Sequence, residues 1–244
     1  MEISSKKSAL VTGANKGIGL EIARQLGKAG FLVFLGARNE ETGEAAAAKL
    51  RAEGLAVHPV ELDLNRKETI DAAASAIKAH SQRLDVLVNN AAIVDPADGP
   101  PGTVDLSVVQ RVMETNFFGT LAVTQAMLPL LREAPAPRIV NMSSGLGSLT
   151  MNGDPAWSFA GAKFLGYNTS KAALNMLTVQ LAYEFRDTPM KVNSANPGYT
   201  ATDMNGNQGH QTVEEGAAEP VRLALLPSDG PTGGFFETAG PNPW

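Results

Sequence analysis

Apolar runs of strand length alternate along this 244-residue chain with amphipathic stretches of helical length, and each run ends in turn residues. This alternation is typical of repeated β-α-β units, in which helices connect parallel strands. The predicted strands span residues 8–12, 31–36, 56–62, 84–90, 138–143, 190–197 and 233–237. The predicted helices lie at about 17–29, 39–53, 66–82, 105–132, 167–187 and 212–226.

The predicted strands are apolar at nearly every position, as in a parallel sheet covered by helices on both faces. We therefore expect an α/β fold of the Rossmann type, a doubly wound parallel sheet of about seven strands. A chain of 244 residues with 43% hydrophobic content buries one sizeable core, so we predict one domain over 1–244, with 1–7 as a flexible tail. Ligands of such sheets bind beyond the carboxyl ends of the strands.

Charge and composition exclude several classes of function. The net charge of −5 and the scattered Lys and Arg argue against a nucleic-acid surface. The chain has no cysteine, and the spacing of His58, His80 and His210 suggests no metal site, so we interpret each histidine as a surface or loop residue. No signal peptide or membrane span is recognisable, and we expect a soluble cytoplasmic protein.

The stretch TGANKGIG follows the first predicted strand and leads directly into a helix. Its glycines, Gly13, Gly17 and Gly19, let the backbone turn tightly and approach a ligand, and the N–H groups of a helix N-terminus attract phosphate. A plain tight turn is the alternative, but this context is that of a dinucleotide-binding loop. The spacing is G-x-x-x-G-x-G, and Asn15, Lys16 and Ile18 complete the loop.

The end of the second predicted strand indicates which dinucleotide binds. A protein selective for NAD places Asp or Glu there to bind the ribose hydroxyls, whereas this chain has Ala37 and then Arg38. Together with Lys16, Arg38 could converge on a 2′-phosphate. Either cation alone could equally be a solvated surface residue, but the two together favour NADP(H).

Tyr167 and Lys171, in YNTSK, lie four positions apart in a predicted helix and so share one face. Seen alone, either could be an ordinary surface residue. In order along the chain stand TGANKGIG, the NNAA of residues 89–92, Asn116, the pair Ser143–Ser144, YNTSK and the NPGYTATDM of residues 196–204. Together these motifs resemble the short-chain dehydrogenase/reductase family, and the NKGIG variant is most similar to its NADPH-dependent carbonyl reductases.

The resemblance spans roughly residues 8–237 and implies the roles of individual residues. It implies Tyr167 as general acid/base with Lys171 as its partner, Ser144 as the holder of the substrate carbonyl, and Asn116 as part of a water chain. Ser144 is preferred to Ser143 because adjacent side chains of a strand point opposite ways. The implied cofactor contacts are the glycine loop, Arg38, Asp63, Leu64, Asn90, Tyr167, Lys171, Pro197, Gly198, Thr200 and Thr202.

The expected activity is NADPH-dependent, reversible reduction of ketones and aldehydes. Such a ketone reductase would act on a small molecule, as a monomer or homodimer. Dehydrogenation of a sugar or a carrier-bound acyl chain would use the same residues, and a non-catalytic NADP sensor is the other alternative. His210, in a polar loop, is a minor candidate for substrate contact.

The segment from Gly145 to Gly166 separates Ser144 from Tyr167 and is rich in apolar residues. Three interpretations of it stay open: a wall of the substrate pocket, a structural pin in which Trp157 and Phe159 pack on the following helix, or a cover over a dimerisation face.

Overall fold

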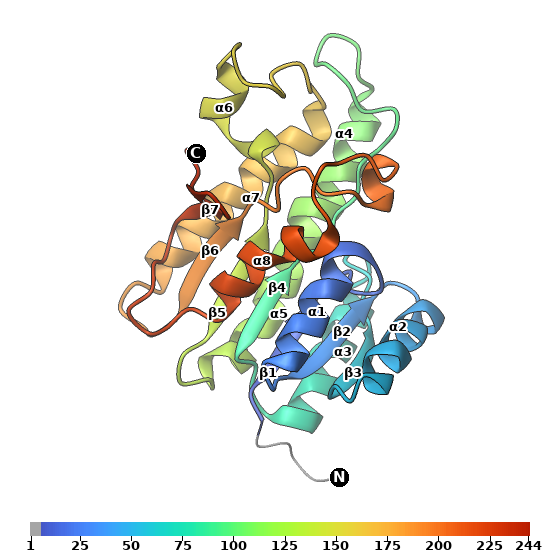
Figure 1. Cartoon of the computed structure of the whole chain (residues 1–244), viewed down its shortest axis with the longest axis vertical. Helices are drawn as coiled ribbons and strands as arrows, with labels where there is room; N and C mark the ends of the chain where they lie inside the picture. Colours follow the sequence, from blue (N-terminus) through green and yellow to red (C-terminus); the bar gives the residue numbers. More distant parts are fainter. Residues whose placement is uncertain (1–5) are drawn as a thin grey trace.

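One twisted sheet runs through the molecule, as the computed structural model of the chain shows for residues 6–244 (Figure 1). Its strands lie in the order β3-β2-β1-β4-β5-β6-β7-β8, and every neighbouring pair is parallel except β7 and β8. The strands are β1 (Ser8–Val11), β2 (Leu32–Ala37), β3 (Val57–Glu61), β4 (Val86–Asn89), β5 (Arg138–Met142), β6 (Lys191–Ala195), β7 (Phe235–Glu237) and β8 (Gly240–Pro241).

The predicted fold class is confirmed, and each of the seven predicted strands is present with ends within a few residues. The eighth strand, β8, is a two-residue antiparallel addition beside β7, too short to leave a pattern in the sequence. Pro59 lies inside β3, which is the edge strand of the sheet. An edge position tolerates proline because one side of the strand needs no partner.

Helices cover both faces of the sheet because adjacent strand residues alternate between two cores. Ala9 and Val11 belong to one core, with α1, α2 and α8; Leu10 belongs to the other, with α3, α5 and α7. The helices are α1 (Gly17–Lys28), α2 (Glu40–Ala52), α3 (Lys67–Ser81), α4 (Leu106–Met113), α5 (Thr120–Arg132), α6 (Leu149–Gly153), α7 (Leu165–Glu184) and α8 (Val213–Ala224). None of them, within residues 6–244, is long and apolar enough to cross a membrane.

The long predicted helix at 105–132 contains a wide turn that periodicity does not reveal. A π-helical segment, Glu114–Gly119, joins α4 to α5. Gly119 closes this segment, and a Cβ there would lie 2.6 Å from the carbonyl oxygen of Leu64. The glycine therefore admits the loop after β3, which leads to the site.

Of the predicted tail at 1–7, residues 1–5 lie outside the described part of the chain, and the Lys7 carbonyl accepts a hydrogen bond from the Leu32 N–H at 2.8 Å. The interpretation of each histidine as a surface or loop residue does not describe His58 and His80 well, because they lie on a strand and a helix and are partly buried. His58 on β3 and His80 on α3 are half-buried, with ring centroids 4.1 Å apart. They meet because β3 and α3, which follow one another in the chain, pack together.

Candidate active site

The glycine loop has the conformation that its sequence predicts. Gly13 and Gly17 have positive φ angles of +62° and +58°, which favour glycine. A Cβ on Gly19 would lie 2.4 Å from the side-chain nitrogen of Asn90. Helix α1 begins at Gly17 without a side-chain cap, so the N–H groups of its first turn have no capping side chain. Such a terminus suits a phosphate.

The loop after β4 holds the glycine loop in place. The Asn90 side-chain amide donates to the carbonyl oxygens of Thr12 (2.9 Å) and Gly13 (3.2 Å). The Thr12 hydroxyl in turn accepts from the N–H groups of Asn90 (3.0 Å) and Ala91 (2.9 Å). Asn90 thus braces the glycine loop, and these hydrogen bonds hold the carboxyl ends of β1 and β4 together.

The residues expected near the adenosine gather at the ends of β2 and β3. Arg38 is exposed and makes neither a hydrogen bond nor an ion pair with any described residue. The Asn15 amide donates to the Thr42 hydroxyl at the start of α2 over 3.5 Å. Asp63 is half-buried, and its carboxylate accepts from the Asn65 N–H at 3.0 Å.

Lys16 is placed differently from the expectation that it would join Arg38. Its Nζ lies 2.8 Å from Oδ2 of Asp203, in the short turn Asp203–Asn205 after β6. Both side chains are exposed, which leaves the ion pair screened and weak. The pair nevertheless links the glycine loop to the segment that follows β6, a contact that no pattern in the sequence indicates.

The residues expected near the nicotinamide lie on that segment. Gly198 has a φ of +72°, and Thr202 approaches the glycine loop, since a Cβ on Gly17 would lie 3.8 Å from its methyl carbon. Thr200 is buried, and its hydroxyl donates to the carbonyl oxygen of Pro197 at 3.0 Å. Its side chain therefore serves the shape of the segment itself.

Ser144, Tyr167 and Lys171 come together where β5 ends and α7 begins. The Ser144 hydroxyl lies beside the Tyr167 phenol and lowers its pKa. Lys171 is almost fully buried, its Nζ lies 5.5 Å from the centre of the Tyr167 ring, and it donates to the carbonyl oxygen of Met142 at 2.7 Å. Ser143 instead faces α7, with its hydroxyl 3.5 Å from the Lys171 carbonyl oxygen. Strand alternation thus separates the two serines.

Burial governs the ionisation of the pair. It raises the pKa of Tyr167 to about 12, against a smaller lowering by the neighbouring Ser144 hydroxyl. It also lowers the pKa of Lys171 to about 8. Tyr167 is therefore a neutral phenol at pH 7. A neutral phenol is a proton donor, the form that carbonyl reduction needs.

Asn116 lies in the π-helical segment, and its side chain is fully engaged. Its oxygen accepts from the Ile93 N–H (2.8 Å), and its nitrogen donates to the Ile93 carbonyl (2.9 Å) and the Ser170 hydroxyl (3.1 Å). Ser170 donates to the Tyr167 carbonyl at 2.7 Å. The Asn116 side chain therefore braces the helix of Tyr167.

The segment 145–166 carries an aromatic row that continues onto the segment after β6. Trp157 meets Phe159 at 5.6 Å, Phe159 meets Tyr199 at 5.5 Å, and Tyr199 meets His210 at 6.1 Å between ring centroids. A Cβ on Gly145, next to Ser144, would lie 3.1 Å from the Trp157 ring. Tyr199 was missed by sequence reasoning, although its position after the NPG turn was a signal. The row lies beside Ser144.

A family model described as short chain dehydrogenase matches residues 7–213 of the chain. The chain belongs to the short-chain dehydrogenase family. The resemblance inferred from the motifs is thus confirmed, and this short-chain dehydrogenase is a member of a family of oxidoreductases.

Individual relatives match over nearly the whole chain. Carbonyl reductase [NADPH] 1 of Mus musculus is 35% identical over 99% of both chains. The (+)-neomenthol dehydrogenase of Capsicum annuum is 31% identical over 96% of both. The solved structure of NADPH-bound carbonyl reductase from chicken fatty liver superposes with a TM-score of 0.85 at 28% identity, covering 100% of this chain and 96% of the other.

Proposed function

We propose that this short-chain dehydrogenase is a carbonyl reductase that uses NADPH to reduce ketones and aldehydes to alcohols, reversibly. The observation that carries the proposal is the placement of Ser144 and Tyr167 next to each other and beside the buried ammonium of Lys171. These groups follow β5 and begin α7, at the same edge of the sheet as the glycine loop. The relatives named as a (+)-neomenthol dehydrogenase and as a carbonyl reductase support the same activity.

The loop residues fit a dinucleotide on structural grounds. Gly13 and Gly19 stand where a Cβ would lie 2.9 Å and 2.4 Å from neighbouring atoms, so the loop keeps a bare backbone surface. The uncapped N-terminus of α1 offers N–H donors to a pyrophosphate. Bound NADPH supplies a hydride to the carbonyl carbon.

The protein's part is proton transfer and charge stabilisation. Tyr167 donates its phenolic proton to the carbonyl oxygen, and Ser144 donates a hydrogen bond to that oxygen as negative charge develops on it. The Lys171 ammonium, 5.5 Å from the ring centre, stabilises the phenolate that remains. In the reverse direction the same phenolate removes the alcohol proton.

Selectivity for NADPH over NADH is part of the proposal. Arg38 is exposed and has no partner among residues 6–244, and Ala37 leaves no carboxylate to repel a 2′-phosphate. Lys16 can exchange its exposed partner Asp203 for a phosphate dianion, because a screened surface pair contributes about 0–1 kcal/mol.

Titration of tryptophan fluorescence with each dinucleotide tests this selectivity. NADPH should bind about tenfold or more tightly than NADH, a difference of about 1.4 kcal/mol. Ala37→Asp with Arg38→Leu should erode or reverse the preference. Asp203→Asn is the matched control, since freeing Lys16 should leave NADPH affinity equal or higher. Equal affinities of the unmodified protein for both dinucleotides contradict the proposal.

The substrate class separates this proposal from its rivals. The aromatic row beside Ser144 favours an apolar carbonyl compound over a sugar, which needs hydrogen-bonding groups. We place the reaction in the cytoplasm, with a small-molecule substrate and the protein as a monomer or homodimer.

Loss of NADPH absorbance at 340 nm, measured against ketones, aldehydes and sugars, tests the activity. Turnover of ketones or aldehydes with little turnover of sugars is expected. Preference for sugars supports the dehydrogenase alternative, and tight NADPH binding without turnover of any compound supports a sensor.

A further inference from the structure

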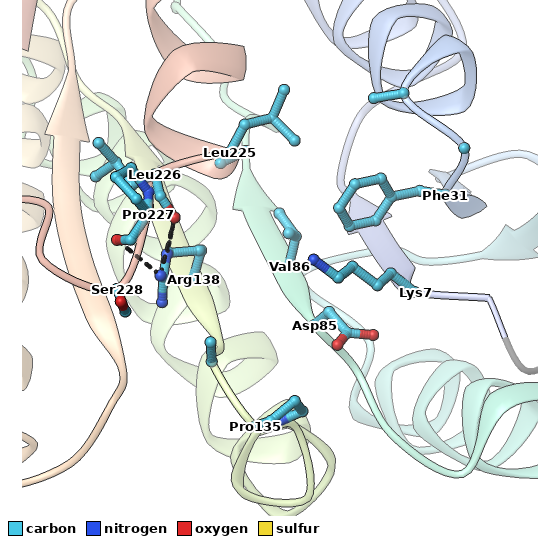
Figure 2. Close-up of a pocket in the computed structure, with 14 residues that line it drawn as sticks. Lys7, Phe31, Asp85, Val86, Pro135, Arg138, Leu225, Leu226, Pro227 and Ser228 are labelled. Atoms are coloured by element: carbon cyan, nitrogen blue, oxygen red, sulfur yellow. Dashed lines mark hydrogen bonds between the residues drawn. The ribbon is translucent and has the colours of Figure 1, made fainter.

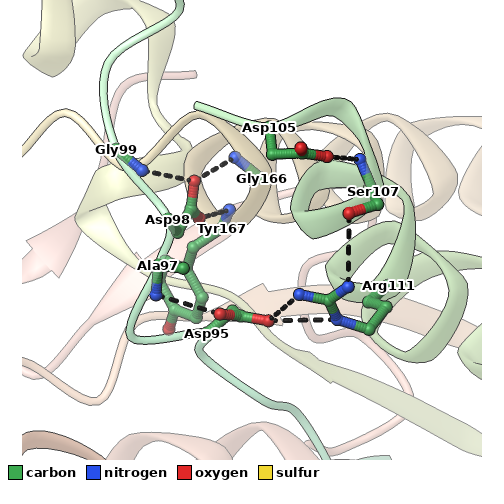
Figure 3. A network of polar contacts seen from close by, with 9 residues as sticks. All are labelled: Asp95, Ala97, Asp98, Gly99, Asp105, Ser107, Arg111, Gly166 and Tyr167. Atoms are coloured by element: carbon green, nitrogen blue, oxygen red, sulfur yellow. Dashed lines mark hydrogen bonds and ion pairs between the residues drawn. The ribbon is translucent and has the colours of Figure 1, made fainter. Parts of the chain in front are cut away.

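The N-terminus of α7 is capped by a segment that lies far away in the sequence. Phe164, the residue before the helix, has a side chain that cannot accept a hydrogen bond, so the first N–H groups of α7 need other partners. The Gly166 N–H donates to Oδ1 of Asp98 at 3.0 Å, and the Tyr167 N–H donates to Oδ2 of Asp98 at 2.8 Å. One carboxylate therefore holds two consecutive N–H groups, one of them on the proposed general acid (Figure 3).

We propose that Asp98 is a positioning residue for Tyr167, fixing the backbone from which the phenol reaches the substrate. This inference rests on the proposed function. Bonds from N–H groups to a carboxylate are charge-assisted and stronger than neutral ones, and a negative charge at a helix N-terminus is favourable. Asp98 thus determines both where α7 begins and where Tyr167 lies.

The loop that carries Asp98 is itself rigid. The Asp98 N–H donates to the Asp95 carbonyl at 2.9 Å, and the Gly99 N–H donates to Oδ1 of Asp98 at 2.9 Å. The Asp95 carboxylate accepts from the Ala97 N–H at 2.9 Å and pairs with Arg111 of α4 at 2.8 Å. Figure 3 shows this second carboxylate directed toward α4, while Asp98 faces the start of α7.

Packing leaves the start of α7 little freedom. A Cβ on Gly166 would lie 3.0 Å from Oδ2 of Asp98 and 3.3 Å from atoms of Val109 and Val112 on α4. The Tyr167 carbonyl also accepts the Ser170 hydroxyl, which Asn116 holds. Tyr167 is therefore held at its N–H group by Asp98 and at its carbonyl by Ser170. A general acid displaced by about 1 Å can lose about a hundredfold in rate, so this placement bears on catalysis.

A matched pair of variants separates positioning from loop stability. Asp98→Ala removes both acceptors from α7, whereas Asp95→Ala removes an ion pair from the same loop without touching α7. We expect Asp98→Ala to lower kcat about 30-fold, with the KM for NADPH changed less than about threefold, because Tyr167 is misplaced and the glycine loop is not. Asp95→Ala should keep kcat within about threefold of the unmodified protein. Asp98→Asn, which keeps one acceptor oxygen, should recover part of the loss.

Amide hydrogen exchange of the peptide covering 164–171 gives a second measurement that needs no turnover. Exchange should be faster in Asp98→Ala than in Asp95→Ala. A kcat for Asp98→Ala within threefold of the unmodified protein, or an equal loss in both variants, overturns the proposal. If Asp98→Ala does not fold, Asp98→Asn takes its place in both measurements. If the unmodified protein turns over no carbonyl compound, the proposed function fails, and unchanged exchange in Asp98→Ala would then overturn the positioning role as well.

Discussion

At the scale of residues, the chemistry of the site comes from burial. Tyr167 and Lys171 are four positions apart on α7, and their surroundings shift both pKa values toward the neutral forms. Lys171 lies beside the Tyr167 ring and donates a hydrogen bond to the Met142 carbonyl oxygen. At pH 7 Tyr167 is therefore a neutral proton donor beside a Lys171 side chain that is still mostly protonated, and the phenolate charge would develop only as the reaction proceeds.

Replacing Tyr167 with phenylalanine removes the proton donor and little else. We expect turnover to fall at least about a hundredfold, since positioned acid catalysis contributes about 10²–10⁴. NADPH affinity, measured by fluorescence titration, should stay within about threefold. A variant that keeps more than a few per cent of activity would show that another group is the acid.

The pH dependence should follow Lys171. Its pKa of about 8 means that the ammonium loses its proton as pH rises through about 8, whereas Tyr167, with a pKa of about 12, stays protonated. We expect kcat/KM with varied NADPH to be level between pH 6 and 7.5 and to fall above about pH 8, because this ratio reports the free enzyme.

Lys171→Arg provides the control for this profile. Arginine stays protonated throughout the range, so the alkaline fall should move to higher pH. A profile that is level to pH 10 in the unmodified protein, or a break unchanged in Lys171→Arg, would assign the titration to another group.

At the scale of elements, the segment 145–166 lies beside the candidate site, next to Ser144. Helix α6 and the loop after it lie together at one end of the molecule (Figure 1). The Trp157 ring packs near Gly145 and continues through Phe159 to Tyr199. This arrangement supports a pocket wall, although the same contacts would also serve a structural pin.

Truncation of Trp157 distinguishes these interpretations. Trp157→Ala should change the ranking of small against bulky ketones by about tenfold or more, with NADPH affinity unchanged. Leu149→Ala is the control from the same segment, because that side chain is 77% exposed. A loss of thermal stability with the ranking preserved would make Trp157 a pin. A change from monomer to dimer in light scattering after removal of 150–160 would favour a cover over a dimer face.

At the scale of the whole molecule, the two ends of the parallel strands carry different features. The carboxyl ends of the strands carry the candidate site, whereas a hollow of about 580 Å³ lies at the amino ends of β1, β4 and β5 (Figure 2). The buried Arg138 lines it and donates to the carbonyl oxygens of Leu226, Pro227, Pro137 and Pro189. Each of its N–H groups is engaged, so Arg138 is a brace between segments.

Arg138→Ala should therefore destabilise the fold without changing the chemistry. We expect the free energy of unfolding to fall by about 3 kcal/mol, because several carbonyl groups lose their donor. Urea unfolding measures this change, and kcat of the folded variant should stay within about twofold. Lys7→Ala, an exposed side chain in the same hollow, should have little effect. If the fully folded Arg138→Ala variant has a lower kcat, the amino ends of the strands would affect the candidate site at the carboxyl ends, and the prediction would be wrong.

The order of the elements, the sheet and the glycine loop could be predicted from the sequence. Each of them requires particular residue types at nearby positions, so each produces a pattern that can be recognised in a short stretch of the chain. Gly13 and Gly17 need positive φ, and strand residues buried on both faces must be apolar. The pairing of Tyr167 with Lys171 was predictable for the same reason, since one helix joins them.

The partners of polar groups in distant segments were decided by the tertiary structure. Nothing near Lys16 indicates Asp203, nothing near Tyr167 indicates Asp98, and the direction of the Tyr167 pKa shift depends on burial by several elements. Local pattern specifies which backbone conformation each segment adopts. Desolvation and hydrogen bonding between segments depend on distances that exist only once the sheet and its helices have packed.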